Sequence, residues 1–96
     1  MNFIFHIGTH KTGSTAIQSF LFANRNRLLK SGILYPSVGL KDKAHHNAAW
    51  TLKAGDINKT KALFLKIERE ASSYEVDTVL LSSEEFEFIR NINLNL

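Results

Sequence analysis

Two glycines, a lysine and several hydroxyl residues lie close together near the amino terminus, where they could bind a phosphate group. Gly8 and Gly13 have the separation found in the loop GxxxxGK[ST], and Thr15 stands at its Ser/Thr position. In such loops backbone N–H groups surround the phosphates, and the lysine reaches the terminal ones. Here Ser14 occupies the lysine position, and Lys11 lies inside the turn. The spacing predicts a phosphate-binding loop whose lysine placement argues against ATP hydrolysis.

The elements on either side of this loop are those that a phosphate site needs. The mostly apolar residues 2–7 predict a buried, central parallel strand, and residues 14–31 predict a helix ended by Gly32. The free N–H groups and positive dipole end of that helix would favour an anion, and Lys11 could reach it from mid-loop. The arrangement suits a 5′-phosphosulfate. The plainer interpretation is an ordinary strand-to-helix turn with Ser/Thr caps.

Three blocks of the chain, HIGTHKTGST, NRNRLLKSGILYPSVG and VLLSSEEF, together with the pair His45–His46, resemble a known family. They are similar to sulfotransferases that use 3′-phosphoadenosine 5′-phosphosulfate, particularly bacterial members. The resemblance implies a P-loop-like three-layer α/β/α fold with a parallel sheet. It implies transfer of a sulfuryl group from that co-substrate to a hydroxyl or amine acceptor, without a required metal.

Sulfuryl transfer needs cationic and N–H donors on the phosphosulfate and a base for the acceptor proton. Lys11 would stabilise the bridging oxygen and the developing charge, and His10 could touch the cofactor from the loop tip. The expected 5′-phosphate ligands use N–H and hydroxyl groups and are Thr12, Gly13, Ser14, Thr15 and Ala16.

The candidates for the base are His46 and Glu84, and related enzymes use either a histidine or a carboxylate. His46 is favoured; because adjacent helical residues point about 100° apart, only one of His45 and His46 should face the site. A packing role for the histidine remains open, as does a helix N-terminal role for Glu84. The carboxyl end of the strand at residues 76–82 should bring Ser82, Ser83 and Glu84 close to the loop. The aromatic residues Trp50, Phe20, Phe22, Phe64, Phe86 and Phe88 are expected in the core. His6 is expected to be structural.

Two alternatives to an active enzyme stay open. One is a non-catalytic relic, or partner-dependent interaction module, that binds only phosphate or sulfate. The other is a small P-loop nucleotide kinase, although the Walker lysine is missing and Glu84 would have to hold magnesium. Metal binding by His10, His45 and His46 is not expected, since adjacent histidines lack the i, i+4 geometry of a zinc helix.

The remaining elements follow from periodicity and capping residues. Helices are expected at residues 44–54, closed by Gly55, and at 56–74, with Asp56 as the N-cap. A strand at residues 76–82 and a helix at 84–91, capped by Ser83, complete the chain. Residues 33–35 form a brief extended piece halted by Pro36. All 96 residues are interpreted as one amino-terminal portion of a sulfotransferase-like domain, incomplete because the family's later Arg and Ser for the 3′-phosphate are missing.

The amino-acid composition limits the classes of partner that we expect for this protein. Hydrophobic residues make up 44% and charged residues 22%, which is typical of a globular protein, and the net charge of +3 suits an anionic cofactor. Lys and Arg are scattered, so nucleic acid is not an expected partner; a small-molecule or carbohydrate acceptor is. Cysteine is absent, which excludes disulfides and thiolate metal sites. No run approaches the roughly 20 apolar residues of a membrane span and the amino end lacks the pattern of a signal peptide, so a cytoplasmic location is assigned by default. Missing strands would leave a sheet edge through which the chain could self-associate.

Overall fold

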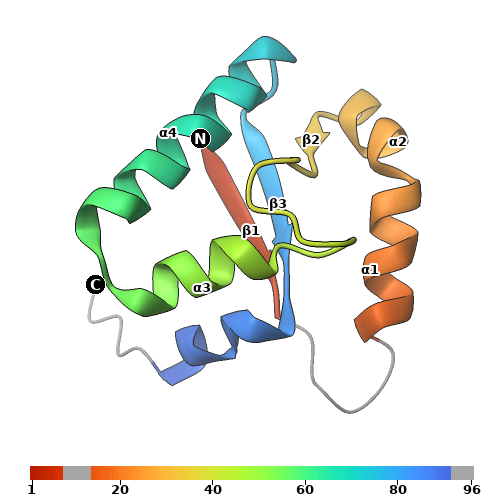
Figure 1. Ribbon diagram of the computed structural model, residues 1–96. Coiled ribbons are helices and arrows are strands. Elements are labelled where there is room, and N and C mark those ends of the chain that lie inside the picture. The colour runs from red at the N-terminus through yellow and green to blue at the C-terminus, as the bar shows by residue number, and fades with distance from the viewer. Residues whose placement is uncertain (8–13, 92–96) are drawn as a thin grey trace.

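The computed structural model describes residues 1–7 and 14–91, and it shows an α/β fold around a small parallel sheet (Figure 1). The three strands are β1 (Asn2–His6), β2 (Ile33–Leu34) and β3 (Thr78–Ser82), in the order β1-β3-β2. Between β1 and β3, Asn2 is paired with Thr78 and His6 with Ser82; between β2 and β3, Ile33 is paired with Thr78. The α/β class and the parallel pairing are confirmed. β3, not β1, is the central strand of the described sheet.

Helices follow the predicted order with shifted ends. They are α1 (Ser14–Ala23), α2 (Arg25–Lys30), α3 (His46–Ala54), α4 (Ile57–Ser73) and the 3₁₀ helix η1 (Glu84–Asn91). Asp56 caps α4 by accepting a hydrogen bond from the Lys59 N–H at 3.1 Å, and Gly55 ends α3 at φ 77°. Both caps were expected from the sequence.

The helix expected at residues 14–31 is divided at Asn24. Its side-chain amide donates to the Phe20 carbonyl oxygen at 2.8 Å, and the Arg25 guanidinium donates to that of Phe22 at 2.7 Å. Side-chain donors thus satisfy carbonyl groups at the end of α1, and this local competition with the backbone favours a break. The prediction of one continuous helix was wrong.

The core lies on one face of the sheet. Val79 and Leu81 of β3 belong to one almost completely buried cluster, together with Ile67 and Ala71 of α4, Ala48 and Ala49 of α3, and Phe86 of η1. Phe3 meets Phe64 edge to face at 5.1 Å between ring centroids, and Phe5 meets Phe86 at 5.2 Å. These contacts fix α4 and η1 against β1 and position the residues that follow β3.

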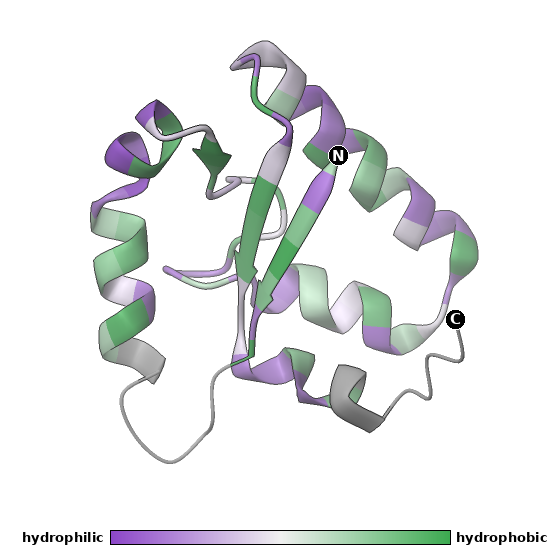
Figure 2. Ribbon diagram, turned by 180° about the vertical axis from the view of Figure 1, so that it is seen from behind, coloured by the Kyte–Doolittle hydropathy of each residue, from purple (hydrophilic) through white to green (hydrophobic). Residues whose placement is uncertain are grey.

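The opposite face is more open. Figure 2 shows β1 and β3 in front of the helices that cover the core face, with α1 and α2 beside the sheet rather than over β1. Ile4, which points to this face, is 47% exposed, and Ile17 and Phe20 of α1 are 46% and 65% exposed. The described residues therefore do not form a third layer over β1. The expectations that β1 is buried and that Phe20 is core were wrong, because α1 lies beside the sheet and does not cover β1.

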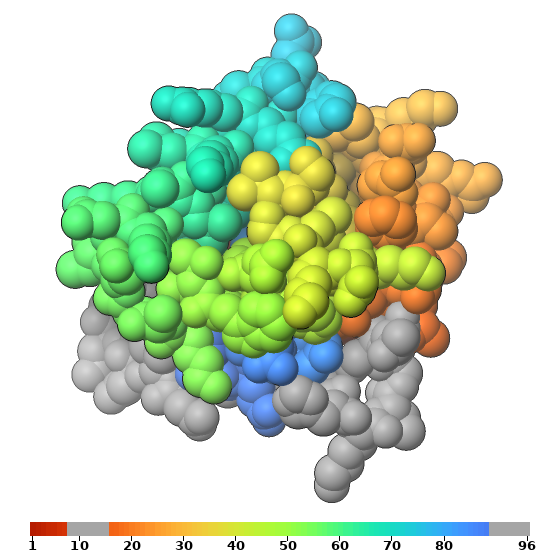
Figure 3. Space-filling view, in the orientation of Figure 1, coloured from red at the N-terminus to blue at the C-terminus, as the bar shows by residue number. Residues whose placement is uncertain are grey.

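The segment between β2 and α3 fills the surface between the two groups of helices. In Figure 3 this segment, in yellow, packs between α1 in orange and the green α3 and α4. The Glu70 carboxylate of α4 accepts hydrogen bonds from the backbone N–H groups of Ser37, at 2.9 Å, and of Val38, at 3.1 Å. Among the described helices, none is long and apolar enough to cross a lipid bilayer.

Candidate functional site

The carboxyl ends of β1 and β3 meet at one edge of the sheet, as the sequence predicted for parallel neighbours. The Ser83 N–H donates to the His6 carbonyl oxygen at 3.1 Å, and the His6 Nδ1 lies 2.7 Å from the Ser82 Oγ. The chain leaves β1 at this edge through Ile7, and it leaves β3 at the same edge through Ser83 and Glu84. Ligands of open parallel sheets bind beyond this edge, so it is the place to look for a functional site.

His45 is a fully buried link between the loop after β2 and the end of β3. The Ser82 N–H donates to its Nδ1 at 3.0 Å, and its Nε2 lies 2.8 Å from the Pro36 carbonyl oxygen. These partners fix the neutral tautomer with hydrogen on Nε2, which donates to Pro36. Burial lowers the pKa of His45 to about 4, although hydrogen bonds and the nearby Glu70 act in the other direction. His45 therefore holds the local fold together.

His46 points the other way, toward solvent and Glu84. Its side chain is 20% exposed, its Nδ1 lies 2.7 Å from the Ser83 Oγ, and its Nε2 lies 3.8 Å from a Glu84 carboxylate oxygen, Oε1. The ring stacks on Trp50 at 5.9 Å, and Trp50 in turn faces the ammonium group of Lys41. Trp50 is 42% exposed, so the expectation that it belongs to the core was wrong. Its indole instead supports the His46 ring.

Glu84 is held by the first turns of α1. The buried Gln18 donates from its Nε2 to Glu84 Oε2 at 3.0 Å. Gln18 is four residues beyond Ser14, which is about 6 Å along a helix axis. The Gln18–Glu84 hydrogen bond and the close His46–Glu84 contact therefore bring together the start of α1, the end of β3 and the start of α3.

An open pocket of about 460 Å³ lies at this place, within the usual range of about 300–1,000 Å³ for small-molecule sites. Its lining combines a phenyl ring with charged and polar groups, and consists of Gln18, Ser19, Phe22, Asp42, Lys43, Ala44, His46 and Glu84. Such a surface suits a ligand that has hydroxyl groups and an apolar side.

A tight turn presents Asp42 and Lys43 to the pocket. The Lys41 N–H donates to the Ala44 carbonyl oxygen at 2.8 Å, and Asp42 adopts φ 59°, the left-handed region that favours glycine. The buried Tyr35 donates from its hydroxyl to the Lys43 carbonyl oxygen at 2.7 Å, and burial raises its pKa to about 12 against a smaller lowering by Ser82. The buried Tyr35 side chain thus holds the turn in place through its hydrogen bond to Lys43.

The other expected site residues have a mixed outcome. His10, Lys11, Thr12 and Gly13 lie outside the described residues. Ser14 and Thr15 are the first residues of α1, where only their backbone is described. Ala16 is exposed on the same helix.

The sequence did not predict two contacts of this site. Ser83 was expected near the loop and as a helix cap, and it has the capping role, since its Oγ accepts the Glu85 N–H at 3.0 Å. Its contact with His46 depends on the docking of α3 beside β3. Gln18 carries no sequence signal, because one glutamine in a helix has no motif.

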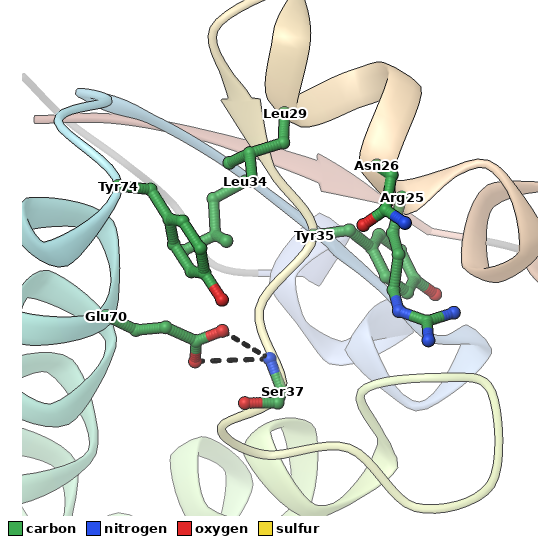
Figure 4. Close-up of a pocket in the computed structure, with 8 residues that line it drawn as sticks. All are labelled: Arg25, Asn26, Leu29, Leu34, Tyr35, Ser37, Glu70 and Tyr74. Carbon is green, nitrogen blue, oxygen red and sulfur yellow. Dashed lines mark hydrogen bonds between the residues drawn. The ribbon is translucent and has the colours of Figure 1, made fainter.

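A second, smaller cavity of about 120 Å³ lies between α2 and α4 (Figure 4). Figure 4 shows Ser37 and Glu70 facing each other across it, joined by hydrogen bonds, with Tyr74 and Arg25 at its sides. The Glu70 carboxylate already accepts hydrogen bonds from the backbone N–H groups of two residues. This cavity therefore has a structural explanation and is too small for most cofactors.

In residues 1–7 and 14–91 no group of three His, Cys, Asp or Glu side chains is arranged to hold a metal ion. The chain was compared with models of protein families, with curated proteins and with solved structures, and none of these comparisons found a match.

Proposed function

We propose that this protein is a sulfotransferase-like P-loop domain that binds 3′-phosphoadenosine 5′-phosphosulfate at residues 8–16 and directs its sulfuryl group to an acceptor beside His46 and Glu84. The observation that carries the proposal is the shared location of three elements. The end of β1, the first turns of α1 and the His46–Glu84 pair lie at one edge of the sheet. The glycine-rich segment connects the first two of these elements.

The proposed reaction assigns one task to each part of the site. A carboxylate or imidazole takes the proton of the acceptor hydroxyl as its oxygen forms a bond to sulfur. The bond between sulfur and the bridging oxygen breaks, and its electron pair stays on the 5′-phosphate. Lys11, the N–H groups of the loop and the start of α1 would stabilise the charge that develops there. The pocket beside Phe22 would hold the acceptor, a small molecule or carbohydrate with a hydroxyl or amine group.

Trp50 offers a direct test, because it is the single tryptophan and stacks on His46. Its fluorescence should change on titration with 3′-phosphoadenosine 5′-phosphate, and ATP with magnesium should compete poorly. Equal or better binding of ATP with magnesium would favour a nucleotide kinase and contradict the proposal. A response to inorganic sulfate alone, without added affinity from the adenosine part, would favour a non-catalytic relic.

A second candidate, a partner-dependent interaction module, is favoured by the outer edge of β1. The Asn2 N–H donates to Asp77 and the His6 carbonyl oxygen accepts from Ser83, so residues 2, 4 and 6 bond β3. The N–H and C=O groups of Phe3 and Phe5 therefore point away from β3, and the described chain places no strand there. Edges of this kind pair with other strands.

Self-association through β1 can be measured by light scattering during size-exclusion chromatography. An Ile4→Lys change should reduce association, since charge on an exposed edge strand opposes pairing. Leu65→Lys, at a residue 52% exposed on α4, is the matched control and should leave association unchanged. A wild-type chain that stays monomeric at high concentration would rule this candidate out.

A further inference from the structure

The hydrogen bonds of Ser83 determine which nitrogen of His46 carries the proton. Ser83 is fully buried, and within the described residues its hydroxyl contacts two groups, the Glu85 N–H at 3.0 Å and the His46 Nδ1 at 2.7 Å. The Glu85 N–H can only donate, so it occupies a lone pair of the Ser83 oxygen. Among the described residues, the acceptor within reach of the Ser83 proton is the His46 Nδ1.

We propose that neutral His46 carries its hydrogen on Nε2 and donates it toward the pocket, and that Glu84 is the group that takes the acceptor's proton. The opposite tautomer would leave the Ser83 proton buried without an acceptor, so it should be disfavoured roughly tenfold or more. An Nε2 that bears hydrogen has no lone pair for a base. The sequence favoured His46 as the base; the direction of this hydrogen bond favours Glu84 instead.

The space between the two side chains fits this assignment. Nε2 and Oε1 are 3.8 Å apart, too far for a direct hydrogen bond. An acceptor oxygen at about 2.8 Å from both could accept from Nε2–H and donate to Oε1. The proton would pass to Oε1 as the oxygen bonds to sulfur, and the electron pair of the broken S–O bond would stay on the 5′-phosphate. This step rests on the proposed function; the tautomer itself does not.

Gln18 and Ser83 act in this scheme as positioning residues. Gln18 donates to Oε2, and Oε1 is the carboxylate oxygen that lies near His46. Ser83 orients the His46 ring through Nδ1, while Trp50 supports the ring face. Lys43 and Asp42 also line the pocket, so both charges face the same space.

Two-dimensional NMR of the imidazole nitrogens tests the tautomer without any ligand. At neutral pH wild-type His46 should show the pattern of hydrogen on Nε2, as should His45, whose Nδ1 accepts from the Ser82 N–H and which serves as internal reference. Ser83→Ala should shift His46 toward a mixture and leave His45 unchanged. Ser73→Ala, on the exposed end of α4, is the control and should change neither. A wild-type His46 with hydrogen on Nδ1, or a pattern insensitive to Ser83→Ala, would overturn the proposal.

Transfer rates of variants at Glu84 and His46 test the roles proposed for these two residues. With 3′-phosphoadenosine 5′-phosphosulfate and glycerol in large excess as the hydroxyl probe, Glu84→Gln should lower the transfer rate about 100-fold or more. His46→Gln keeps an N–H donor, so its transfer rate should fall clearly less than that of Glu84→Gln. Loss of activity in His46→Gln as large as in Glu84→Gln would contradict the assignment. If the wild-type chain fails to bind the cofactor, the proposed function fails, whereas the NMR result still decides the tautomer.

Discussion

The buried His45 makes the stability of the protein depend on pH in a way that can be calculated. Burial lowers its pKa from 6.5 to about 4 in the folded chain, and the unfolded chain keeps the ordinary value. Between these values the unfolded state binds a proton that the folded state does not. The free energy of unfolding should therefore fall as the pH falls from about 6.5 to about 4. At 1.36 kcal/mol for each pKa unit, the full loss is about 3 kcal/mol.

Besides the cost of burying its charge, a protonated ring could not keep both of its partners. The Nδ1 would gain hydrogen and could no longer accept the Ser82 N–H, whereas Nε2 would still donate to Pro36. A buried N–H would lose its acceptor at the end of β3. A loss of about 3 kcal/mol is a large part of the roughly 5–15 kcal/mol that stabilises a domain.

His45→Asn is the matched variant, because its Oδ1 can take the place of Nδ1 as the acceptor for Ser82 but does not titrate. Urea unfolding, followed by circular dichroism at several pH values from 7 to about 4, gives the free energy for both chains. The variant should be less stable at pH 7, yet its stability should fall less steeply with acid. Parallel curves for wild type and His45→Asn would refute the reasoning.

Two further predictions concern single backbone positions and are checked by the same unfolding measurements. Gly39→Ala should destabilise the protein by about 1–3 kcal/mol more than Gly32→Ala, since both residues have positive φ but a Cβ at Gly39 would lie 2.7 Å from the Ala48 Cβ. Equal losses would mean that backbone strain alone matters. Asp56→Ala should cost about 0.5–2 kcal/mol by removing the cap of α4, whereas Asp56→Asn should keep most of the stability. Equal losses in these two variants would argue against the cap.

Local signals explain which parts of the fold could be predicted from the sequence. The amphipathic pattern of α4, its cap Asp56 and the left-handed Gly55 depend on neighbours within a few residues, and all three were predicted. The parallel pairing of β1 with β3 followed from two apolar segments joined through helices.

Features that depend on distant residues were predicted less well. The position of β1 at the edge and the exposure of Phe20 depend on how α1 packs, which helical periodicity does not report. The division at Asn24 depends on two side-chain hydrogen bonds to the backbone. Apolar residues were therefore assigned to the core too readily.

The candidate site shows the same division. Placing Glu84 near the end of β1 needed only the rule for parallel strands. The angle between adjacent helical residues indicated that only one of His45 and His46 would face the site, but it did not say which. The contacts of Gln18 and Ser83 join segments 66 and 37 residues apart in the sequence, so they required the three-dimensional arrangement. The proposed proton direction at His46 rests on one of these contacts.

The most direct test of the proposed function is calorimetric titration of the purified chain with 3′-phosphoadenosine 5′-phosphate. Lys11→Ala tests the loop, and Lys66→Ala, at an exposed position on α4, controls for loss of one positive charge. We expect micromolar binding that Lys11→Ala weakens by about tenfold or more and Lys66→Ala leaves unchanged, as one charge-assisted hydrogen bond contributes about 1.5–3 kcal/mol. Absence of binding, or binding that Lys11→Ala does not affect, would contradict the assignment of residues 8–16 as a phosphosulfate site.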